Sequence, residues 1–514
     1  MMWALAVFPL VVVLGTIMGW RKPAHLAAAA GVAVAALLIW WRPEFTLPGS
    51  ALGRAAGGAG LLVLNAAAVM LPGVYLSQVL TRRGVHNSLQ EWVRGLPLPV
   101  PAKVALVIAG IAPTVEALTG FGVSLLVTVP VLLALAPPPT ALRQAMLGMN
   151  IMPWGTLGLA TVIGAELISL PTATLGTATA ITSSLVFPLV AVWAALLARP
   201  SRRLGTAALA AGAGALLSAG LLTFNRLGIV APAGVLAGLF TTAAGLVLAA
   251  VWHRRSSETG SPAAHFARGE TIGEIQGRGA HSLKQAEPVT GSLLPPRAVL
   301  QAYGLVLGGI AMLRAATAAG VPPLSLHAGG ASFALLSSPG LPLLAAALLL
   351  DRGRPHLPDA RAALVRVARP LLALTGFVAL GRLMADSGMI TELGAAVASA
   401  PLLVVALAAP ALGMLSGFVT GSNVGGNVLM LPLQQQLAPA GLDTWFAAVQ
   451  NSGAGHAVFT SLPMIMLILA VAGDHAKNSG TSERTLLRFG LRVAAAIYTA
   501  LAVVTIVVVF LAAG

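Results

Sequence analysis

The pattern that decides the fold occurs twice: Glu116-Ala-Leu-Thr-Gly-Phe-Gly122 is followed by Asn150, and Val419-Thr-Gly-Ser-Asn423 is followed by Asn451. In both segments the threonine of the Thr-Gly pair precedes the asparagine by 31 residues. A proline and a Leu-Ala-Pro sequence lie between them, one position later in the second segment. Because glycine and proline interrupt helices, we expect an apolar segment broken at glycine, a turn marked by proline, and a second interruption at the asparagine.

Composition places these segments in a membrane. Of the 514 residues, 57% are apolar and 9% are charged, whereas a soluble domain has about 25% charged residues. So few charges cannot cover a soluble surface, which excludes a soluble enzyme, a secreted repeat protein and a disordered chain. The chain has no cysteine, so disulfides, zinc-thiolate sites and iron–sulfur clusters are excluded, and we expect no metal or cofactor. We predict an all-α polytopic membrane protein.

Apolar segments of about 20 residues can cross a bilayer core of ~30 Å. The candidate segments are 2–20, 24–41, 57–80, 102–118, 120–136, 143–165, 172–198, 206–224, 228–252, 297–318, 330–350, 362–385, 391–409, 411–431, 444–473 and 489–513. Several contain Gly, Pro or Asn, so we expect about 12–14 transmembrane helices, with the other segments forming half-helices or re-entrant hairpins.

The chain divides into two halves joined by a polar segment. We predict an N-terminal membrane half at 1–252 with the first motif at 116–158, and a C-terminal half at 297–514 with the second motif at 414–463. Residues 253–296 are rich in Gly, Ser, Pro and charges, as is typical of a cytoplasmic linker. Interrupted segments at matching positions of two halves predict two inverted repeats and place a transporter's binding site at the interruptions.

The net charge of +15 is spread over short basic clusters between the apolar segments, rather than over one face or tail. These clusters are Arg21-Lys22, Arg82-Arg83, Arg199 to Arg203, Arg254-Arg255, Arg352 to Arg369, and Arg484 to Arg492. Such clusters mark cytoplasmic loops of membrane proteins, so we do not expect nucleic-acid binding. Placing them all inside predicts that the N- and C-termini are both outside, on the periplasmic side.

The broken segments themselves predict an anion site. Unwinding a helix in a membrane frees backbone N–H and C=O groups, and each costs several kcal/mol if it stays unpaired. The N-terminus of a half-helix presents N–H groups and a positive dipole end, which suit the carboxylate of a small organic acid. A coupling ion can bind at the opposite, C-terminal ends.

The motif residues also resemble a known family. Glu116 to Gly122 with Pro130, and Asn150-Ile-Met-Pro153 with Gly155-Thr-Leu-Gly158, are similar to the first signature region of the L-lactate permease family. The second region is matched by Thr420 to Asn423 with Asn427, Asn451-Ser-Gly-Ala-Gly455 and Pro463. This resemblance implies a carrier of the ion-transporter superfamily type that moves L-lactate, D-lactate or glycolate with protons across the bacterial inner membrane.

Carried over by position, the resemblance implies a substrate site that includes the motif residues and three neighbouring hydroxyl residues. These are Gly120, Phe121, Gly122, Asn150, Gly421, Ser422, Asn423, Asn427 and Asn451, with Thr119, Thr420 and Ser452. The chain departs from the family pattern where Ser124 replaces a proline, where Gly425 and Gly426 replace hydroxyl residues, and where Phe459 replaces a lysine. Losing that lysine removes a carboxylate partner, which makes the chain a divergent member and leaves a substrate other than lactate open.

Ionisable residues inside spans are functional candidates, because burying them is costly. Glu116 and His456 are the proton-coupling candidates; the alternatives are a carboxylate held by the adjacent hairpin and a satisfied interfacial histidine. Arg382 either pairs with Asp386, one turn away, or binds the substrate carboxylate in place of the missing lysine. We expect Glu166 to be interfacial.

Gln434, Gln435 and Gln436 are expected to face water or the opposite bundle. A membrane-embedded enzyme is disfavoured because Ser416, Ser422 and His456 form no known serine–histidine motif, and no charge ring supports a channel. A sodium-coupled carrier of another organic anion and an exchanger stay open, as does a homodimer, which related folds suggest by analogy.

Overall fold

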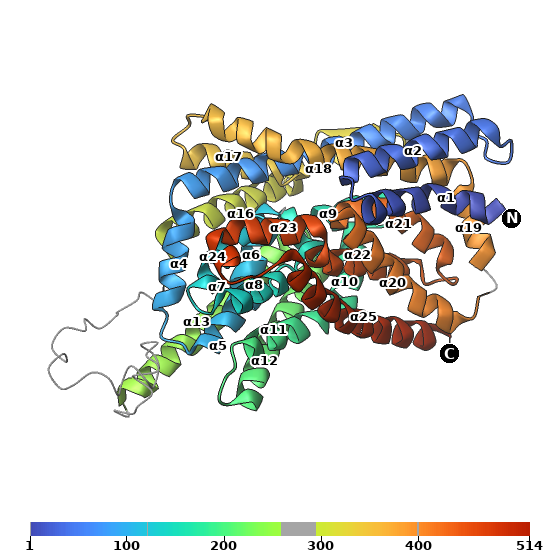
Figure 1. Cartoon of the computed structure of the whole chain (residues 1–514). Helices are drawn as coiled ribbons and strands as arrows, with labels where there is room; N and C mark the ends of the chain where they lie inside the picture. Colours follow the sequence, from blue (N-terminus) through green and yellow to red (C-terminus); the bar gives the residue numbers. More distant parts are fainter. Residues whose placement is uncertain (1, 121, 259–293, 398–399, 514) are drawn as a thin grey trace.

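The computed structural model describes residues 2–120, 122–258, 294–397 and 400–513, and it is predominantly helical (Figure 1). Before the linker the helices are α1 (Met2–Leu14), η1 (Gly15–Gly19), α2 (Ala24–Trp41), α3 (Gly49–Arg82), α4 (Val85–Gly95), α5 (Val100–Leu106), η2 (Val107–Ile111), α6 (Ala112–Thr119), α7 (Leu125–Leu133), α8 (Pro138–Leu147), η3 (Met152–Trp154), α9 (Gly155–Leu167), α10 (Thr172–Thr182), α11 (Val186–Leu197), α12 (Arg203–Arg226) and α13 (Ala233–Glu258).

After the linker the elements are α16 (Arg297–Ala318), β1 (Ser325–Ala328), β2 (Ala331–Ala334), η4 (Leu335–Ser337), α17 (Gly340–Leu350), α18 (Leu357–Asp386), α19 (Met389–Val397), α20 (Leu402–Thr420), α21 (Asn423–Leu437), α22 (Asp443–Ala457), η5 (Val458–Thr460), α23 (Leu462–Ala472), α24 (Asp474–Asn478) and α25 (Glu483–Ala513). The predicted linker, 253–296, lies mostly outside the described residues.

The helices confirm an all-α polytopic membrane protein. In the described part of the chain, ten helices are long and apolar enough to cross a membrane. Three further pairs, α8 with α9, α10 with α11, and α22 with α23, are bent by 57°, 45° and 42° at short breaks. Counting each bent pair as one span gives thirteen, within the expected 12–14. The span at 100–119 is completely buried, so it lies in the protein's centre and not against lipid.

Three expected spans are wrong. Segment 330–350 is not one helix, because β1 and β2 form an antiparallel hairpin there, with His327 opposite Ser332, and only the short helix α17 follows. Segments 391–409 and 411–431 are also divided differently, because α20 runs to Thr420 and the chain breaks at Gly421. The prediction of a break at Gly421 was therefore correct, whereas the predicted boundaries of the spans on either side of it were wrong.

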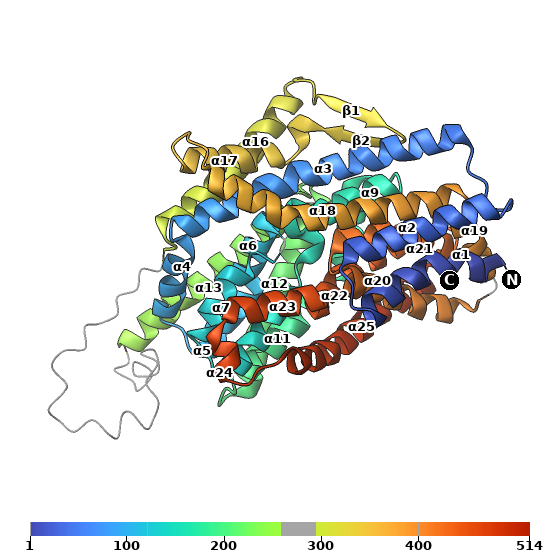
Figure 2. The same cartoon turned by 45° about the horizontal axis from the view of Figure 1, so that its top comes forward.

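Helices from both halves form each of two parts. Helices α1–α3 pack with α16–α18 as one layer (Figures 1 and 2). The helices that carry the two motifs, α6–α9 and α20–α23, pack with α10–α13 and α25 into a body against that layer. The contact between them runs mainly through α18 on α21 and α3 on α9. Both termini lie at one end of the molecule (Figures 1 and 2).

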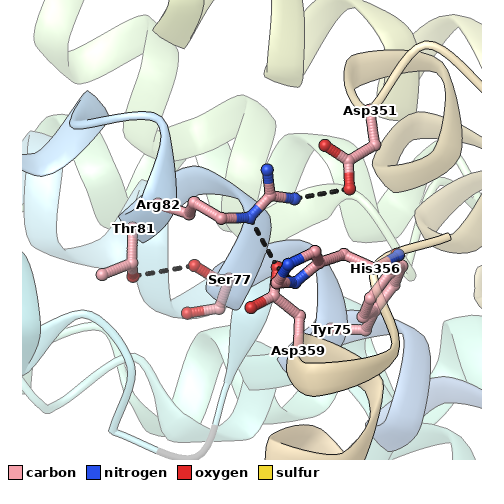
Figure 3. Close-up of polar contacts among 7 residues, drawn as sticks. All are labelled: Tyr75, Ser77, Thr81, Arg82, Asp351, His356 and Asp359. Atoms are coloured by element: carbon pink, nitrogen blue, oxygen red, sulfur yellow. Dashed lines mark hydrogen bonds and ion pairs between the residues drawn. The ribbon is translucent and has the colours of Figure 1, made fainter. Parts of the chain in front are cut away.

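A polar cluster ties the two halves together at the other end of the layer (Figure 3). Arg82, the last residue of α3, donates hydrogen bonds to Asp351 and to Asp359 Oδ2, the latter at 2.8 Å. The backbone N–H of His356 donates to the Tyr75 hydroxyl at 3.1 Å. The Arg82 contact holds the pKa of Asp351 below its ordinary range. The α17–α18 connection is thus fastened to the end of α3.

Candidate functional site

Four interruptions of the helices form the framework of the candidate site. The first motif is broken at Gly120 and 122–124, between α6 and α7, and at 148–151, between α8 and η3, with a left-handed turn at Thr156–Gly158. The second motif is broken at Gly421–Ser422, between α20 and α21, and at Ser461, between η5 and α23. Each motif is therefore two broken helices in succession, as expected.

The positions of three residues differ from the expectation. Pro130 lies inside α7 and Pro432 inside α21, and the turns come a few residues later. Asn150 lies in a break as predicted, but Asn451 lies within the continuous helix α22, and the interruption follows at Ser461. Thr161 of α9 and Thr179 of α10 pair with the Asn451 side chain, and contacts of this kind cannot be seen in the local sequence.

Glycine is required at the first break. Gly120 has φ 72° and ψ −173°, a conformation open essentially only to glycine. A β-carbon there would lie 1.7 Å from the Thr156 hydroxyl oxygen, so the break packs directly on the left-handed turn. A β-carbon on Gly122 would lie 3.1 Å from the Met464 sulfur, at the start of α23.

The breaks of the second motif join the same region. A β-carbon on Gly421 would lie 3.3 Å from Pro463 and 3.4 Å from the Ser461 hydroxyl oxygen. Pro153, in η3, packs against Gly455 of α22, where a β-carbon would lie 2.6 Å from the proline ring. The two motifs, whose asparagines are 301 residues apart, therefore meet in the centre of the body.

Asn451 is the centre of a buried hydrogen-bond network. Its Oδ1 atom accepts from Asn423 Nδ2 at 3.1 Å and from Asn427 Nδ2 at 2.8 Å. Its Nδ2 atom donates to the hydroxyl oxygens of Thr161 at 2.9 Å and Thr179 at 3.0 Å. One side chain thus connects α9, α10, α21 and α22, and all three predicted asparagines of the second motif belong to one cluster.

Buried oxygen atoms beside this network lack partners. The Oδ1 atoms of Asn150, Asn423 and Asn427, and the Ser461 hydroxyl oxygen, have no hydrogen-bond partner among the described residues. Buried polar atoms are nearly always paired, so these atoms mark a place that can take a ligand with hydrogen-bond donors. Beside them the Ser422 hydroxyl accepts from Gly425 N at 3.3 Å and caps α21, whose N-terminus points into the breaks.

Glu116 holds the first break in shape. It is completely buried, and its carboxylate accepts from Gly122 N at 3.0 Å, Ser124 N at 3.2 Å and Ser124 Oγ at 2.7 Å. A proline at position 124 could not supply this N–H, so serine at this position helps to hold the break. Thr119 and Thr420 bond back to the carbonyls of Val115 and Ser416 in their own helices.

His456 belongs to a second polar group on α22. Its Nε2 atom is 2.9 Å from the Ser183 hydroxyl, its ring meets the edge of Phe187 at 5.5 Å, and the backbone of Asn150 lies beside it. The Ser183 hydroxyl donates to Ser452 Oγ at 3.0 Å. His456 has no exposed surface.

The chain matches the model of the L-lactate permease family over residues 3–284 and 311–512. It belongs to that family. No curated protein matches the sequence at a significant level. Membership of the lactate permease family makes this chain a multi-pass membrane transporter for a small organic acid, not a member of an enzyme family. The two motifs of this permease are the segments that meet in the body.

Several candidate residues of the permease lie elsewhere. Arg382 and Asp386 do not form the ion pair considered above, and Arg382 lines a separate cavity between α18 and α21. Glu166 accepts from Ser332 N and Oγ in the hairpin, at 3.3 and 3.1 Å. Gln434 is buried and donates to Ala409 O at 2.7 Å, so the expectation that it faces water is wrong. Phe121 lies outside the described residues.

The sequence did not single out two residues that hold Asn451. Thr161 and Thr179 are ordinary hydroxyl residues in apolar helices, and a threonine there can bond to its own helix. The sequence feature that could have indicated this contact is the hydroxyl-rich segment 172–184, which includes Thr179, Thr182 and Ser183. The hydroxyl of Thr182 also contacts Ser452, so this run provides one wall of the network.

Proposed function

We propose that the protein is a secondary active transporter that takes up 2-hydroxymonocarboxylates of the L-lactate type together with protons. The observation that carries this proposal is the group of unpartnered buried oxygens, Asn150 Oδ1, Asn423 Oδ1 and Asn427 Oδ1, beside the N-terminus of α21. A carboxylate alone offers no donor to these oxygens. A hydroxyl on the neighbouring carbon does, which favours a hydroxy acid such as L-lactate, D-lactate or glycolate.

The substrate carboxylate would bind at the helix N-terminus. The first N–H groups of an α-helix have no partner within the helix, and its dipole favours an anion there. Ser422 caps one of these groups in α21, and Gly421, with φ 64°, lets the chain turn sharply into the helix. The carboxylate then lies at Gly421 to Asn423, with the substrate hydroxyl toward Asn427.

Glu116 is the proposed proton-coupling residue. Its carboxylate accepts three hydrogen bonds from Gly122 and Ser124 in the first break, and a protonated carboxyl group has lost one of its acceptor sites. Proton binding would therefore loosen Gly122 and Ser124 and change the shape of the break. His456 is the weaker candidate, because it contacts a serine hydroxyl, an aromatic ring and backbone rather than an acidic group.

The two-part packing supports a way to alternate access. The layer α1–α3 with α16–α18 would stay in place as a scaffold, and a homodimer would form through it, while the body carrying both motifs moves against it. We place the basic loops in the cytoplasm and both termini in the periplasm of a bacterial inner membrane, following the distribution of arginine and lysine.

Uptake by reconstituted protein tests the proposal. Proteoliposomes would receive labelled L-lactate with and without an inward proton gradient, and unlabelled D-lactate, glycolate and a dicarboxylate would serve as competitors. We expect saturable uptake that the proton gradient accelerates and that monohydroxy acids compete for. Uptake that does not depend on the proton gradient but depends on a sodium gradient would contradict proton coupling. If lactate is neither taken up nor able to compete, the proposed substrate would be wrong.

A further inference from the structure

We propose that the cavity lined by Arg382 is a second binding site for a small monocarboxylate, at which substrate is captured before it reaches the helix breaks. The cavity has a volume of about 170 Å³ and lies between the C-terminal parts of α18 and α21 and the start of α19. This inference rests on the proposed function, since it names where that function's substrate first binds.

The chemistry of the cavity suits a carboxylate. Arg382 is the charged residue that lines it, and its buried Nε atom has no hydrogen-bond partner among the described residues. Gln435, Gln436 and Thr391 add amide and hydroxyl groups. A guanidinium presents a planar fork of donors that matches a carboxylate, so the free donor and the missing acid partner point to an anion.

The size of the cavity suits a hydroxy acid of the lactate type. A cavity of about 150 Å³ in another protein accommodates benzene, which has six non-hydrogen atoms. L-lactate also has six non-hydrogen atoms, so about 170 Å³ is sufficient. Thr391 and Gln436 are exposed at the mouth, and Val428 is buried at the floor.

The position of the cavity links it to the breaks. Val428, at its floor, directly follows Asn427 in α21, and Gln435 lies eight residues beyond Asn427, a distance of ~12 Å along a helix. Helix α19 lies at the same end of the molecule as the two termini (Figure 1), the side that the proposed topology makes periplasmic. The layer contributes Arg382 and the body contributes Gln435, so movement of the body would reshape this site.

The absence of natural cysteine permits a direct test, because a cysteine placed in the chain is the sole thiol. In the Thr391→Cys protein, the rate of alkylation by N-ethylmaleimide would be measured with increasing L-lactate. The same measurement would be made with Ser337→Cys, an exposed position in a different cavity of about 580 Å³, as the control. We expect L-lactate to slow alkylation at position 391 and to leave position 337 unaffected.

Second substitutions separate the cavity from the breaks. Arg382→Gln added to Thr391→Cys should raise the L-lactate concentration for half-protection roughly tenfold or more, whereas Arg369→Gln, an exposed position on the same helix, should not. Asn427→Leu should leave protection at 391 in place. The capture site would be overturned if L-lactate gave no protection at position 391. It would also be overturned if Arg382→Gln left the protection unchanged, or if Asn427→Leu abolished it.

Lactate uptake measured in the same preparations separates this inference from the proposed function. Protection that depends on Arg382 in a protein without lactate uptake would contradict the proposed transport and leave the capture site standing. Uptake without any protection would contradict the capture site alone.

Discussion

Replacing Asn451 by alanine should destabilise the body more than any other single asparagine change. The side chain makes four hydrogen bonds, to Asn423, Asn427, Thr161 and Thr179. Hydrogen bonds between membrane helices contribute about 0.6 kcal/mol each on average, so the four together contribute about 2.4 kcal/mol. Asn427 keeps its contact with Ala160 O at 3.2 Å, which limits the loss at that partner.

The assay is the free energy of unfolding in mixed detergent micelles, measured as a double-mutant cycle. Asn451→Ala, Thr179→Val and the double variant isolate the bond between Asn451 and Thr179, for which we expect a coupling energy of about 0.6 kcal/mol. Asn225→Ala is the matched control, because Asn225 is equally buried and donates only to Leu221 O in its own helix. An Asn451→Ala protein as stable as the control, with no coupling to Thr179, would refute the network.

Three further predictions concern the breaks and the α3 cluster. Gly120→Ala should cost roughly 1–3 kcal/mol from its backbone conformation alone and more from the clash with Thr156, so Thr156→Gly should restore part of the thermal stability. Glu116→Gln should leave lactate counterflow measurable but remove its acceleration by a proton gradient, and unchanged gradient dependence would place coupling elsewhere. The Arg82 contact lowers the pKa of Asp351, so the ion pair should stabilise the fold above about pH 4 and lose this effect as the pH falls further. The difference in unfolding free energy between wild type and Arg82→Gln should therefore shrink below about pH 4. A difference that stays constant with pH would contradict this.

Local chemistry was enough to predict the two breaks at glycine. Gly120 and Gly421 both have positive φ, and the sequence indicated them because glycine in an apolar segment, followed by polar residues, favours a helix end. The same local reasoning gave a wrong prediction at two prolines. Pro130 and Pro432 also suggest turns, but a membrane helix tolerates proline where neighbouring helices compensate for the lost hydrogen bond.

Contacts between distant segments could not be predicted in the same way. Asn451 was expected at an interruption because an asparagine inside a membrane helix is costly, yet Thr161 and Thr179 from two other helices satisfy it. Arg382 had an obvious partner one turn away in Asp386, but the direction of its side chain depends on how α18 packs on α21. The hairpin at 325–334 was not predicted, because its apolar residues are equally compatible with part of a transmembrane helix.

Competition between two acids that differ by one hydroxyl tests the central claim most directly. Inhibition of labelled L-lactate uptake would be measured with unlabelled L-lactate and with propionate, which lacks the 2-hydroxyl group, in wild type and in Asn427→Ala. If the unpartnered oxygens at the breaks bind the substrate hydroxyl, wild type should prefer L-lactate at least tenfold, and the preference should shrink in the variant. Equal inhibition by the two acids in wild type, or a preference that Asn427→Ala leaves intact, would contradict the assignment of the site.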